Sequence, residues 1–322
     1  MTESDAPQAE GSTRLQLRRL IEGSQLVICP GVSDPFVARL AEQAGFEMVF
    51  SSGAGIANWM LGLPDLGLAT MGEILEATRR ISRAVRIPVL ADIDTGYGGA
   101  INVFRTVQEF EAAGAAGVQI EDQVNPKRCG HLSRKEVVTL GEMIERLVAA
   151  REARRDPAMV IVGRTDAVAT DGLAEAIGRG RAFAEAGADV VFIEAPTTLD
   201  AIATIPGEIP APVLINIVEG GLTPAVSHEE LERIGYRIAL HANAVMRVAS
   251  AAARDALERL RLTGHPSEAG RPMLSWADRQ AAVGLPEWEA LEDTLAARTS
   301  EVMNTIAAST GAEAVPQEKG QK

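Results

Sequence analysis

Three segments of the chain share one pattern of hydrophobic and polar positions. In each, a stretch rich in Ala and Glu ends at an Ala-Gly pair and a short apolar run follows: AEQAGFEMVFSSG (41–53), FEAAGAAGVQIED (110–122) and FAEAGADVVFIEA (183–195). Glycine just beyond the end of a helix is the usual residue of a left-handed cap. The apolar runs do not alternate with polar residues, which is typical of strands covered on both faces. The pattern therefore predicts helices that lead into buried parallel strands.

Apolar runs of this kind occur eight times along the chain. They are LVICPG (26–31), EMVFSS (47–52), PVLADID (88–94), GVQIED (117–122), MVIVGRTD (159–166), DVVFIEA (189–195), PVLINIV (212–218) and RIALHAN (237–243). Helix-like stretches separate them, and the length of chain that the eight runs span, residues 26–243, suits a (β/α)₈ barrel. An open doubly wound sheet is the alternative, but the first strand–helix turn lacks the G-x-G-x-x-G sequence of that fold. We therefore predict an α/β fold of the (β/α)₈ TIM-barrel type.

The barrel pattern occupies residues 14–265, and we predict that this range is a single catalytic domain. Residues 1–13 and 305–322 are polar, so we expect both to be disordered tails. The sequence of 266–304 predicts a separate C-terminal helical segment.

Composition and charge narrow the class of protein. The formal net charge of -13 at pH 7 argues against a nucleic-acid partner, which attracts basic surfaces. Two cysteines, Cys29 and Cys129, are too few for a disulfide framework and suggest a reducing compartment. The first residues lack the apolar core of a signal peptide, and no apolar run reaches the roughly 18 residues that a membrane helix needs. We therefore expect a cytoplasmic protein without a membrane or nucleic-acid partner.

Polar side chains occupy the C-terminal ends of five predicted strands. They are Asp92 and Asp94, Glu121 and Asp122, Arg164 and Asp166, Glu194, and Asn216. A single acidic residue in this position is commonly just the N-cap of the next helix. The carboxyl ends of parallel barrel strands, however, meet at one rim, where enzymes of this fold have their active sites. Five such strand ends therefore favour an active site over a set of helix caps.

The sequence LADIDTGYGG places Asp92 and Asp94 two positions apart, so both side chains point to one face of a strand. Two carboxylates this close repel each other unless a cation lies between them. Oxygen ligands favour a hard ion, Mg²⁺ or Mn²⁺, over zinc. A pair of helix caps or turn residues is the alternative interpretation. Glu121 on the next strand favours the metal site.

Cys129 lies in a basic loop, NPKRCGH (125–131), directly after a predicted strand. The absence of a C-x-x-C sequence and of a nearby second cysteine argues against a zinc ligand and against a redox thiol. A thiol with a pKa of about 8.5 is mostly protonated at pH 7 and can donate a proton. We therefore predict that Cys129 is a catalytic acid and that Lys127 and Arg128 bring positive charge to a carboxylate substrate. An inert loop cysteine with solvated basic neighbours is the alternative.

Several motifs occur together between residues 14 and 262. In order they are SSGAG, LGLPDLG, DIDTGYG, IEDQVNPKRCGH, GRTDA, IEAP and NIVEGGLTP. With these motifs the chain resembles the isocitrate lyase/phosphoenolpyruvate mutase superfamily, and within it methylisocitrate lyase, 2,3-dimethylmalate lyase and carboxyphosphonoenolpyruvate mutase. The resemblance implies a (β/α)₈ barrel, a homotetramer with an exchanged C-terminal helix, bound Mg²⁺ and a small polycarboxylate substrate.

The resemblance also implies roles for individual residues. Asp92 would approach the metal directly, while the other metal-site carboxylates would act largely through its water molecules: Asp65, Asp94 and Glu121. Cys129 would be the general acid, and its loop would include Lys127, Arg128, Gly130 and His131. Arg164 would stabilise charge that develops on the substrate. The remaining residues would bind the substrate: Ser52, Gly53, Ala54, Glu194, Asn216 and Arg247.

The implied activity is Mg²⁺-dependent cleavage of a carbon–carbon bond in a 2-hydroxy di- or tricarboxylate. Substrates of the 2-methylisocitrate or 2,3-dimethylmalate type would give pyruvate or another 2-oxo acid and a second carboxylate. A phosphonate-forming mutase of the carboxyphosphonoenolpyruvate mutase type is the alternative. A non-catalytic barrel is a third hypothesis, but it predicts the loss of a metal carboxylate or of the loop cysteine, and the chain retains both. Phe50 and Val218 depart from the methylisocitrate lyase pattern, and NIVEGG leans toward the dimethylmalate lyase and phosphonate mutase branches.

Overall fold

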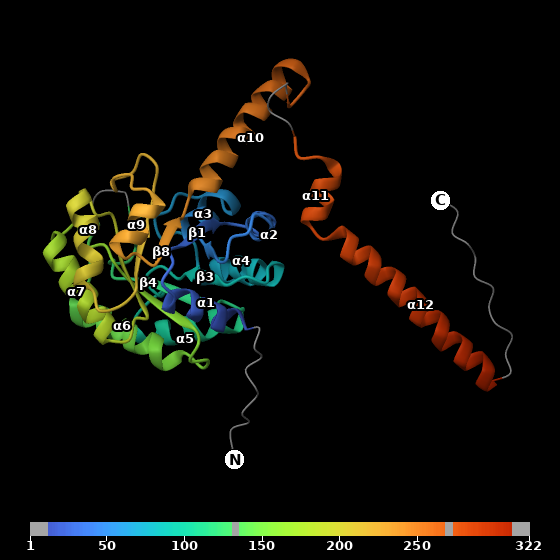
Figure 1. Cartoon of the computed structure of the whole chain (residues 1–322), viewed down its shortest axis with the longest axis horizontal. Coiled ribbons are helices and arrows are strands. Elements are labelled where there is room, and N and C mark those ends of the chain that lie inside the picture. Colours follow the sequence, from blue (N-terminus) through green and yellow to red (C-terminus); the bar gives the residue numbers. More distant parts are fainter. Residues whose placement is uncertain (1–11, 131–134, 268–272, 311–322) are drawn as a thin grey trace, which may run out of the picture. The chain divides into compact units, whose positions relative to one another are not determined.

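The computed structural model describes residues 12–130, 135–267 and 273–310. Within these ranges, eight parallel strands follow one another around a closed barrel, and β8 pairs with β1 (Figure 1). The strands are β1 (Val27–Val32), β2 (Val49–Ser51), β3 (Val89–Asp92), β4 (Gly117–Glu121), β5 (Val160–Thr165), β6 (Val190–Ile193), β7 (Val213–Asn216) and β8 (Ile238–His241). Each predicted apolar run coincides with one strand to within a few residues, which confirms the predicted (β/α)₈ fold. Most strands are shorter than the runs because the last residues of the runs belong to the loops at the barrel rim.

One helix precedes the first strand and others follow the strands, and most of those between strands cover the outside of the barrel (Figure 1). They are α1 (Thr13–Glu22), α2 (Pro35–Gln43), α3 (Gly53–Gly55), the π-helix η1 (Ile56–Met60), α4 (Met71–Ala84), α5 (Ala100–Ala112), α6 (Leu140–Ala153), α7 (Leu173–Glu185), α8 (Leu199–Glu208), α9 (His228–Ile234) and α10 (Ala244–Thr263). Local sequence fixes several of their starts. At α4 and α6, a Thr side chain accepts a hydrogen bond from the third helical residue, and the Glu side chain there accepts one from the Thr backbone. Such capping boxes satisfy amide groups that the first helical turn leaves free.

Alternate residues of the strands fill the inside of the barrel. Cys29, Phe50 and Val162 belong to this inner cluster, together with Leu17 and Ile21 of α1. Leu17 is fully buried, and it contacts residues at the N-terminal ends of the strands. Helix α1 therefore closes the end of the barrel that lies opposite the predicted active site.

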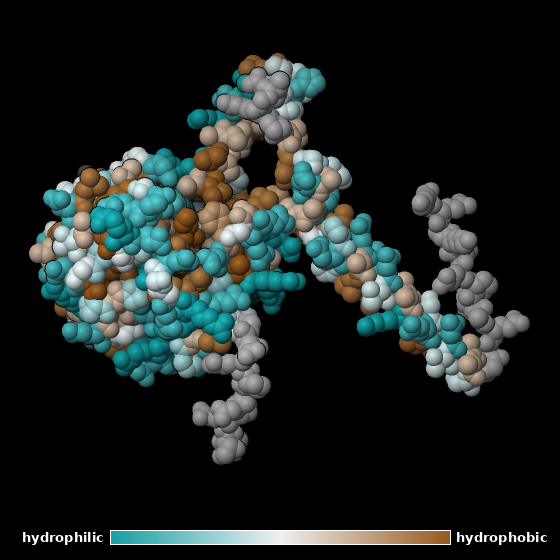
Figure 2. Space-filling view, viewed as in Figure 1, coloured by the Kyte–Doolittle hydropathy of each residue, from teal (hydrophilic) through white to brown (hydrophobic). Residues whose placement is uncertain are grey.

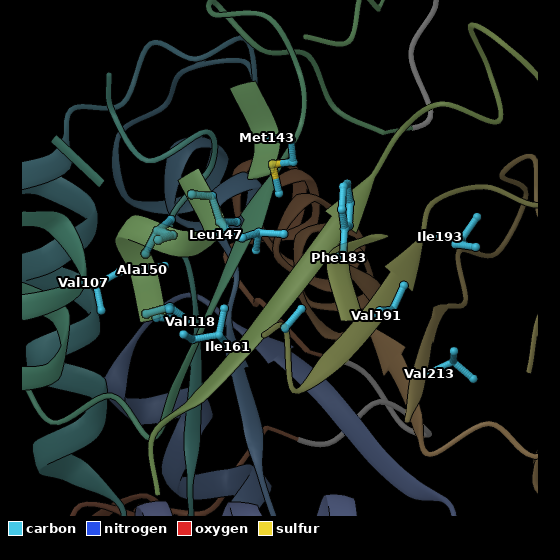
Figure 3. Packing of buried hydrophobic residues seen from close by; sticks show 14 of the residues in the cluster. Val107, Val118, Met143, Leu147, Ala150, Ile161, Phe183, Val191, Ile193 and Val213 are labelled. Carbon is cyan, nitrogen blue, oxygen red and sulfur yellow. The ribbon is translucent and has the colours of Figure 1, made fainter. Parts of the chain in front are cut away.

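The intervening strand residues point outward and pack against the helices. Figure 3 shows this layer, in which Ile161 and Val191 of the strands lie beside Leu147 of α6 and Phe183 of α7. The same strands are therefore apolar on both faces, as the unalternating runs predict. Because side chains alternate along a strand, the inner positions continue at the C-terminal rim as Ser52, Asp92, Glu121, Arg164, Glu194 and Asn216.

An ion-pair cluster stabilises the N-terminal end of the barrel. Asp189 accepts a hydrogen bond from Arg18 of α1 at 2.6 Å and one from Arg154 at 2.8 Å. Its carboxylate also accepts from the backbone amide of Ile161 at 2.8 Å. These contacts join α1, the end of α6 and β6, far along the strands from the polar rim.

The described chain divides into two compact units, with the boundary between Pro266 and Ser267. The second contains α11 (Trp276–Ala282) and α12 (Leu285–Thr310). Helix α12 continues to Thr310, so the prediction of a disordered tail is wrong for residues 305–310. Alanine favours helix here, and the Thr305 and Ser309 hydroxyls donate hydrogen bonds to carbonyls of the helix. Residues 1–11 and 311–322 lie outside the described ranges.

Helix α10 exposes a series of large apolar side chains, which Figure 2 shows in brown along the helix. Val248, Leu257 and Leu262 are each about two thirds exposed or more. The homotetramer and the exchanged C-terminal helix remain predictions. Among the helices that the structure describes, none combines the length and the hydrophobicity that crossing a membrane requires.

The position of α1 makes a prediction for stability. Leu17→Ala should lower the free energy of unfolding by about 3 kcal/mol, because it removes buried methyl groups and leaves a cavity in the inner cluster. Urea unfolding followed by circular dichroism measures this change. Leu199→Ala, at a position of α8 that is 60% exposed, is the matched control and should change stability little. Equal effects of the two substitutions would contradict the role assigned to α1.

Candidate active site

A cavity opens at the C-terminal ends of the strands and encloses about 430 Å³, part of it open to solvent. Most of the predicted site residues line it: Ser52, Ala54, Asp65, Asp92, Lys127, Cys129, Gly130, Arg164, Glu194 and Asn216. The remaining wall contains Phe50, Gln119, Phe192, Leu240, Ala242 and Asn243. The cavity therefore has a charged part and an apolar part, and it brings together residues from many strands and loops.

Lys127 lies between two of the predicted metal-site carboxylates. Its ammonium group is 2.6 Å from Asp65 Oδ1 and 2.7 Å from Asp94 Oδ1, and its side chain is buried. Burial alone would lower the pKa of Lys127, but the surrounding carboxylates, with Asp94 the strongest, raise it well above its usual value. Lys127 therefore stays protonated, and its charge is shared with the carboxylates of the chain.

Arg164 is the centre of a second ion-pair cluster. Its guanidinium lies 3.3 Å from Glu121 and 3.2 Å from Glu194, and its Nε donates to Asp166 Oδ2 at 2.9 Å. Burial disfavours the charge, but the three carboxylates, with Asp166 the strongest, raise the pKa of Arg164 well above its usual value. The guanidinium also lies 5.2 Å from the centre of the Phe192 ring.

The two clusters contain more negative than positive groups. Six carboxylates (Asp65, Asp92, Asp94, Glu121, Asp166 and Glu194) accompany three cations (Lys127, Lys135 and Arg164). Burial, and then the neighbouring Asp94, raise the pKa of Asp92 to about 6. Burial also raises the pKa of Glu121 well above its usual value, despite the opposing effect of Arg164. A further cation in the cavity would stabilise the ionised form of both groups.

Four buried polar oxygens around the site have no hydrogen-bond donor among the described residues. They are Tyr97 OH, Gln119 Oε1, Glu121 Oε1 and Asn216 Oδ1. Buried oxygens without partners are costly, so they indicate positions where a ligand or bound water would donate or coordinate.

The carboxylates fit a hard cation that keeps much of its water. Nowhere in the described ranges do three or more His, Cys, Asp or Glu side chains form a group that could enclose a metal. Mg²⁺ usually takes only one or two carboxylates directly and retains several waters, so it does not need such a group. The oxygen donors and the excess negative charge therefore suit Mg²⁺ or Mn²⁺. Among the described residues, no Lys or Arg side chain forms an ion pair with Asp92, so this carboxylate is the one open to a metal ion.

The loop that carries Cys129 is held at several points. The side chain of Gln123 accepts a hydrogen bond from Arg128 N at 2.9 Å and donates one to Arg128 O at 2.8 Å. The amide of Cys129 donates to the carbonyl of Asp65 at 3.3 Å. A β-carbon at Gly130 would lie 2.6 Å from Arg164 Nη2 and from the Glu194 carboxyl carbon. Glycine is therefore required where the loop backbone packs on the Arg164–Glu194 pair.

The segment after β2 brings backbone amides next to Asp92. Gly53 N donates to Asp92 Oδ2 at 3.2 Å, and Ser52 Oγ accepts from Gly55 N at 3.1 Å. Ser52 and Ala54 line the cavity. Contact between these residues and a substrate carboxylate remains a prediction. The hydroxyl of Ser52 and the backbone amides of this segment lie close to Asp92 and could donate hydrogen bonds to such a carboxylate.

Three predicted residues lie apart from the rest. Arg247 does not line the cavity; it donates to the backbone carbonyl of Glu219 at 2.7 Å and is half exposed. The backbone of Arg128 is fixed by Gln123, but its side chain does not belong to the cavity wall. His131 lies outside the described residues. Their roles toward a substrate remain predictions.

Residues without a predicted role that the structure brings into or next to the site include Gln119, Gln123, Lys135 and Asp166. Gln119 precedes Glu121 by two positions on β4, so strand alternation could have identified it. Asp166 was visible as a strand end. No local pattern connects Lys135 to the site, because its partner lies 31 residues further along the chain.

Comparison with known proteins shows the family to which the chain belongs. The family model described as phosphoenolpyruvate phosphomutase matches residues 17–261. The chain is 42% identical over 284 residues to a 2-methylisocitrate lyase of Shewanella oneidensis, covering 88% of this chain and 96% of that protein. It is 43% identical over 244 residues to a 2,3-dimethylmalate lyase of Eubacterium barkeri, covering 76% and 84%.

Among solved structures, oxaloacetate acetylhydrolase in complex with the inhibitor 3,3-difluorooxalacetate superposes with a TM-score of 0.84. The two sequences are 35% identical, and the match covers 89% of this chain and 98% of that one. The chain belongs to the isocitrate lyase/phosphoenolpyruvate mutase superfamily.

Proposed function

We propose that the protein is a Mg²⁺-dependent carbon–carbon lyase, for which Mn²⁺ can substitute. Its substrate would be a 2-hydroxy di- or tricarboxylate of the 2,3-dimethylmalate or 2-methylisocitrate type, and its products a 2-oxo acid such as pyruvate and a second carboxylate. The observation that carries this proposal is that one cavity contains both the carboxylates suited to a divalent cation and a thiol, Cys129, able to give a proton. The two lyase relatives support the same reaction class.

Asp92 would hold the cation directly, and Asp65, Asp94 and Glu121 would hold its water molecules. The bound ion would acidify the substrate hydroxyl group. Ser52, Ala54 and the Gly53 amide, next to Asp92, would then orient the carboxylate beside that hydroxyl. The excess negative charge of the two clusters makes this part of the cavity suited to a dication and not to a free anion.

Arg164 would stabilise negative charge as the bond between the hydroxyl-bearing carbon and its neighbour breaks. The hydroxyl proton would pass to water or to a carboxylate of the cavity, and the electron pair left on the oxygen would form the carbonyl of the oxo acid. The electron pair of the broken carbon–carbon bond would pass to the departing carbon, which would take the proton of the Cys129 thiol. Phe50, Phe192 and Leu240 form an apolar wall that would exclude water and accept the methyl groups of an alkyl-substituted substrate. This wall favours a substrate with small apolar substituents.

A substrate panel tests the reaction class. With Mg²⁺ present, incubation with 2,3-dimethylmalate, 2-methylisocitrate, oxaloacetate and phosphoenolpyruvate should release a 2-oxo acid from at least one of the two hydroxy acids. A coupled dehydrogenase measures that product. A phosphonate-forming mutase would instead give no oxo acid from the hydroxy acids and would rearrange a phosphoenolpyruvate-type substrate, which phosphorus NMR detects.

Cys129→Ser should lower kcat by about 1000-fold, because a serine hydroxyl is too weak an acid to replace the thiol. Substrate affinity should stay within about threefold of wild type, since the change removes little binding surface. Steady-state kinetics and calorimetric binding give the two values. Cys29→Ala is the matched control because Cys29 is buried inside the barrel and does not line the cavity. Near wild-type kcat in Cys129→Ser would show that another group supplies the proton.

Asp92→Asn should weaken Mn²⁺ binding by at least about tenfold, because it removes the charge of the proposed direct ligand while keeping its size. Electron paramagnetic resonance of free Mn²⁺ measures this affinity without any substrate. Asp200→Asn, on the exposed surface of α8, should leave the affinity unchanged. An Asp92→Asn variant that binds Mn²⁺ like wild type would refute the metal assignment.

A further inference from the structure

Lys135 is a buried cation outside the residues that line the cavity. Only 1% of its side chain is exposed, and its ammonium group donates hydrogen bonds to Asp166 Oδ1 at 2.8 Å and to the backbone carbonyl of Gly130. Burying an ammonium group costs several kcal/mol unless it is paired and hydrogen-bonded. Asp166 supplies the opposite charge. Lys135 also donates to the carbonyl of Gly130, the residue after Cys129. An ion pair with a purely structural role would not need this contact.

Asp166 connects Lys135 to the active site. The oxygen that accepts from Lys135 also accepts from Arg164 Nη2 at 3.2 Å, and the other oxygen accepts from Arg164 Nε at 2.9 Å. Burial would raise the pKa of Asp166, but Arg164 and Lys135 together hold it below its usual value. One ionised carboxylate therefore orients both cations.

Asp166 is itself firmly placed. Its backbone amide donates to Asp122 Oδ1 at 3.0 Å, and Asp122 Oδ2 accepts from Thr165 Oγ1 at 2.7 Å and from Arg179 at 3.1 Å. All these side chains are buried. The carboxylate that binds Lys135 is thus fixed to the end of β5 and cannot follow a shift of the loop.

The carbonyl that Lys135 binds belongs to the tightest part of the Cys129 loop. At Gly130 the backbone leaves no room for a side chain above the Arg164–Glu194 pair. A movement of this carbonyl would therefore displace the thiol of the preceding residue relative to Arg164. Displacements of about 1 Å at a reacting group can cost roughly 100-fold in rate.

We propose that Lys135 is a positioning residue that joins the Gly130 carbonyl to Asp166 and thereby sets the place of the Cys129 thiol relative to Arg164. Lys135 does not itself contact the substrate, because it is absent from the cavity wall. The effect on turnover rests on the proposed function. The effect on the loop backbone does not, and it can be measured without substrate.

Amide hydrogen exchange of the Mg²⁺-loaded full chain tests the loop directly. Lys135→Met should raise the exchange rate of the Arg128 and Cys129 amides, which donate to Gln123 and Asp65, by about tenfold. Exchange in β5 should stay as in wild type. If Lys135→Met does not fold, Lys135→Gln, which keeps an uncharged donor, should give a smaller rise of about threefold at the same amides.

Arg154→Met is the matched control. It removes a partly buried cation from Asp189 at the opposite end of the barrel, so it reports general destabilisation by the loss of an ion pair. It should leave the Arg128 and Cys129 amides unchanged. Two results would overturn the proposal and make Lys135 a structural residue only. One is that the two amides exchange at the same rate in Lys135→Met as in wild type; the other is that Lys135→Met raises exchange over the whole barrel, as general destabilisation would.

Turnover provides the second measurement, with the hydroxy acid that the substrate panel identifies. Lys135→Met should lower kcat by about 100-fold and leave KM within about threefold, because it misplaces the acid and spares the binding groups. An unchanged kcat would overturn the proposal. If wild type releases no oxo acid from any hydroxy acid, the proposed function fails, while the exchange experiment still decides the position of the loop.

Discussion

The structure depends on an excess of buried carboxylates at one end of the barrel. Six acidic side chains share three cations in the clusters around Lys127 and Arg164. Burial, and after it the neighbouring negative charges, raise the pKa values of Asp92 and Glu121, because the ionised form is unfavourable at this end of the barrel. A divalent cation bound there would offset this repulsion. The stability of this end of the barrel would then depend on the ligand that we propose it binds.

The rest of the fold makes this cost tolerable. Helix α1 and the apolar inner cluster close the opposite end of the barrel, and the outer cluster joins the strands to their helices. At that end, the carboxylate of Asp189 is paired with two arginines, so no buried negative charge is left without a partner in this cluster. The stabilising core contacts and the proposed active site thus lie at opposite ends of the same strands, as is usual in barrels of this type.

The loop after β4 links the two ion-pair clusters. Lys127 binds the carboxylates near the proposed metal position, whereas Gly130 packs on the Arg164–Glu194 pair. Cys129 lies between these residues in the chain, so both contacts fix its place. Through Lys135 and Asp166, the backbone of the same loop is joined to the end of β5. The geometry accounts for a basic loop in an acidic protein: its cations hold the loop against the carboxylates of the barrel.

The barrel could be predicted from the sequence because unalternating apolar runs and Ala-Gly helix ends are local signals. The positions of Asp92, Glu121, Arg164 and Glu194 at the rim could be predicted too, since the strand ends of a barrel meet there. Which charges pair could not be predicted. Lys127 lies between Asp65 and Asp94, and Lys135 reaches Asp166, across separations that no local pattern encodes. Pairing of charges depends on distances in space, and only the closed barrel fixes those distances.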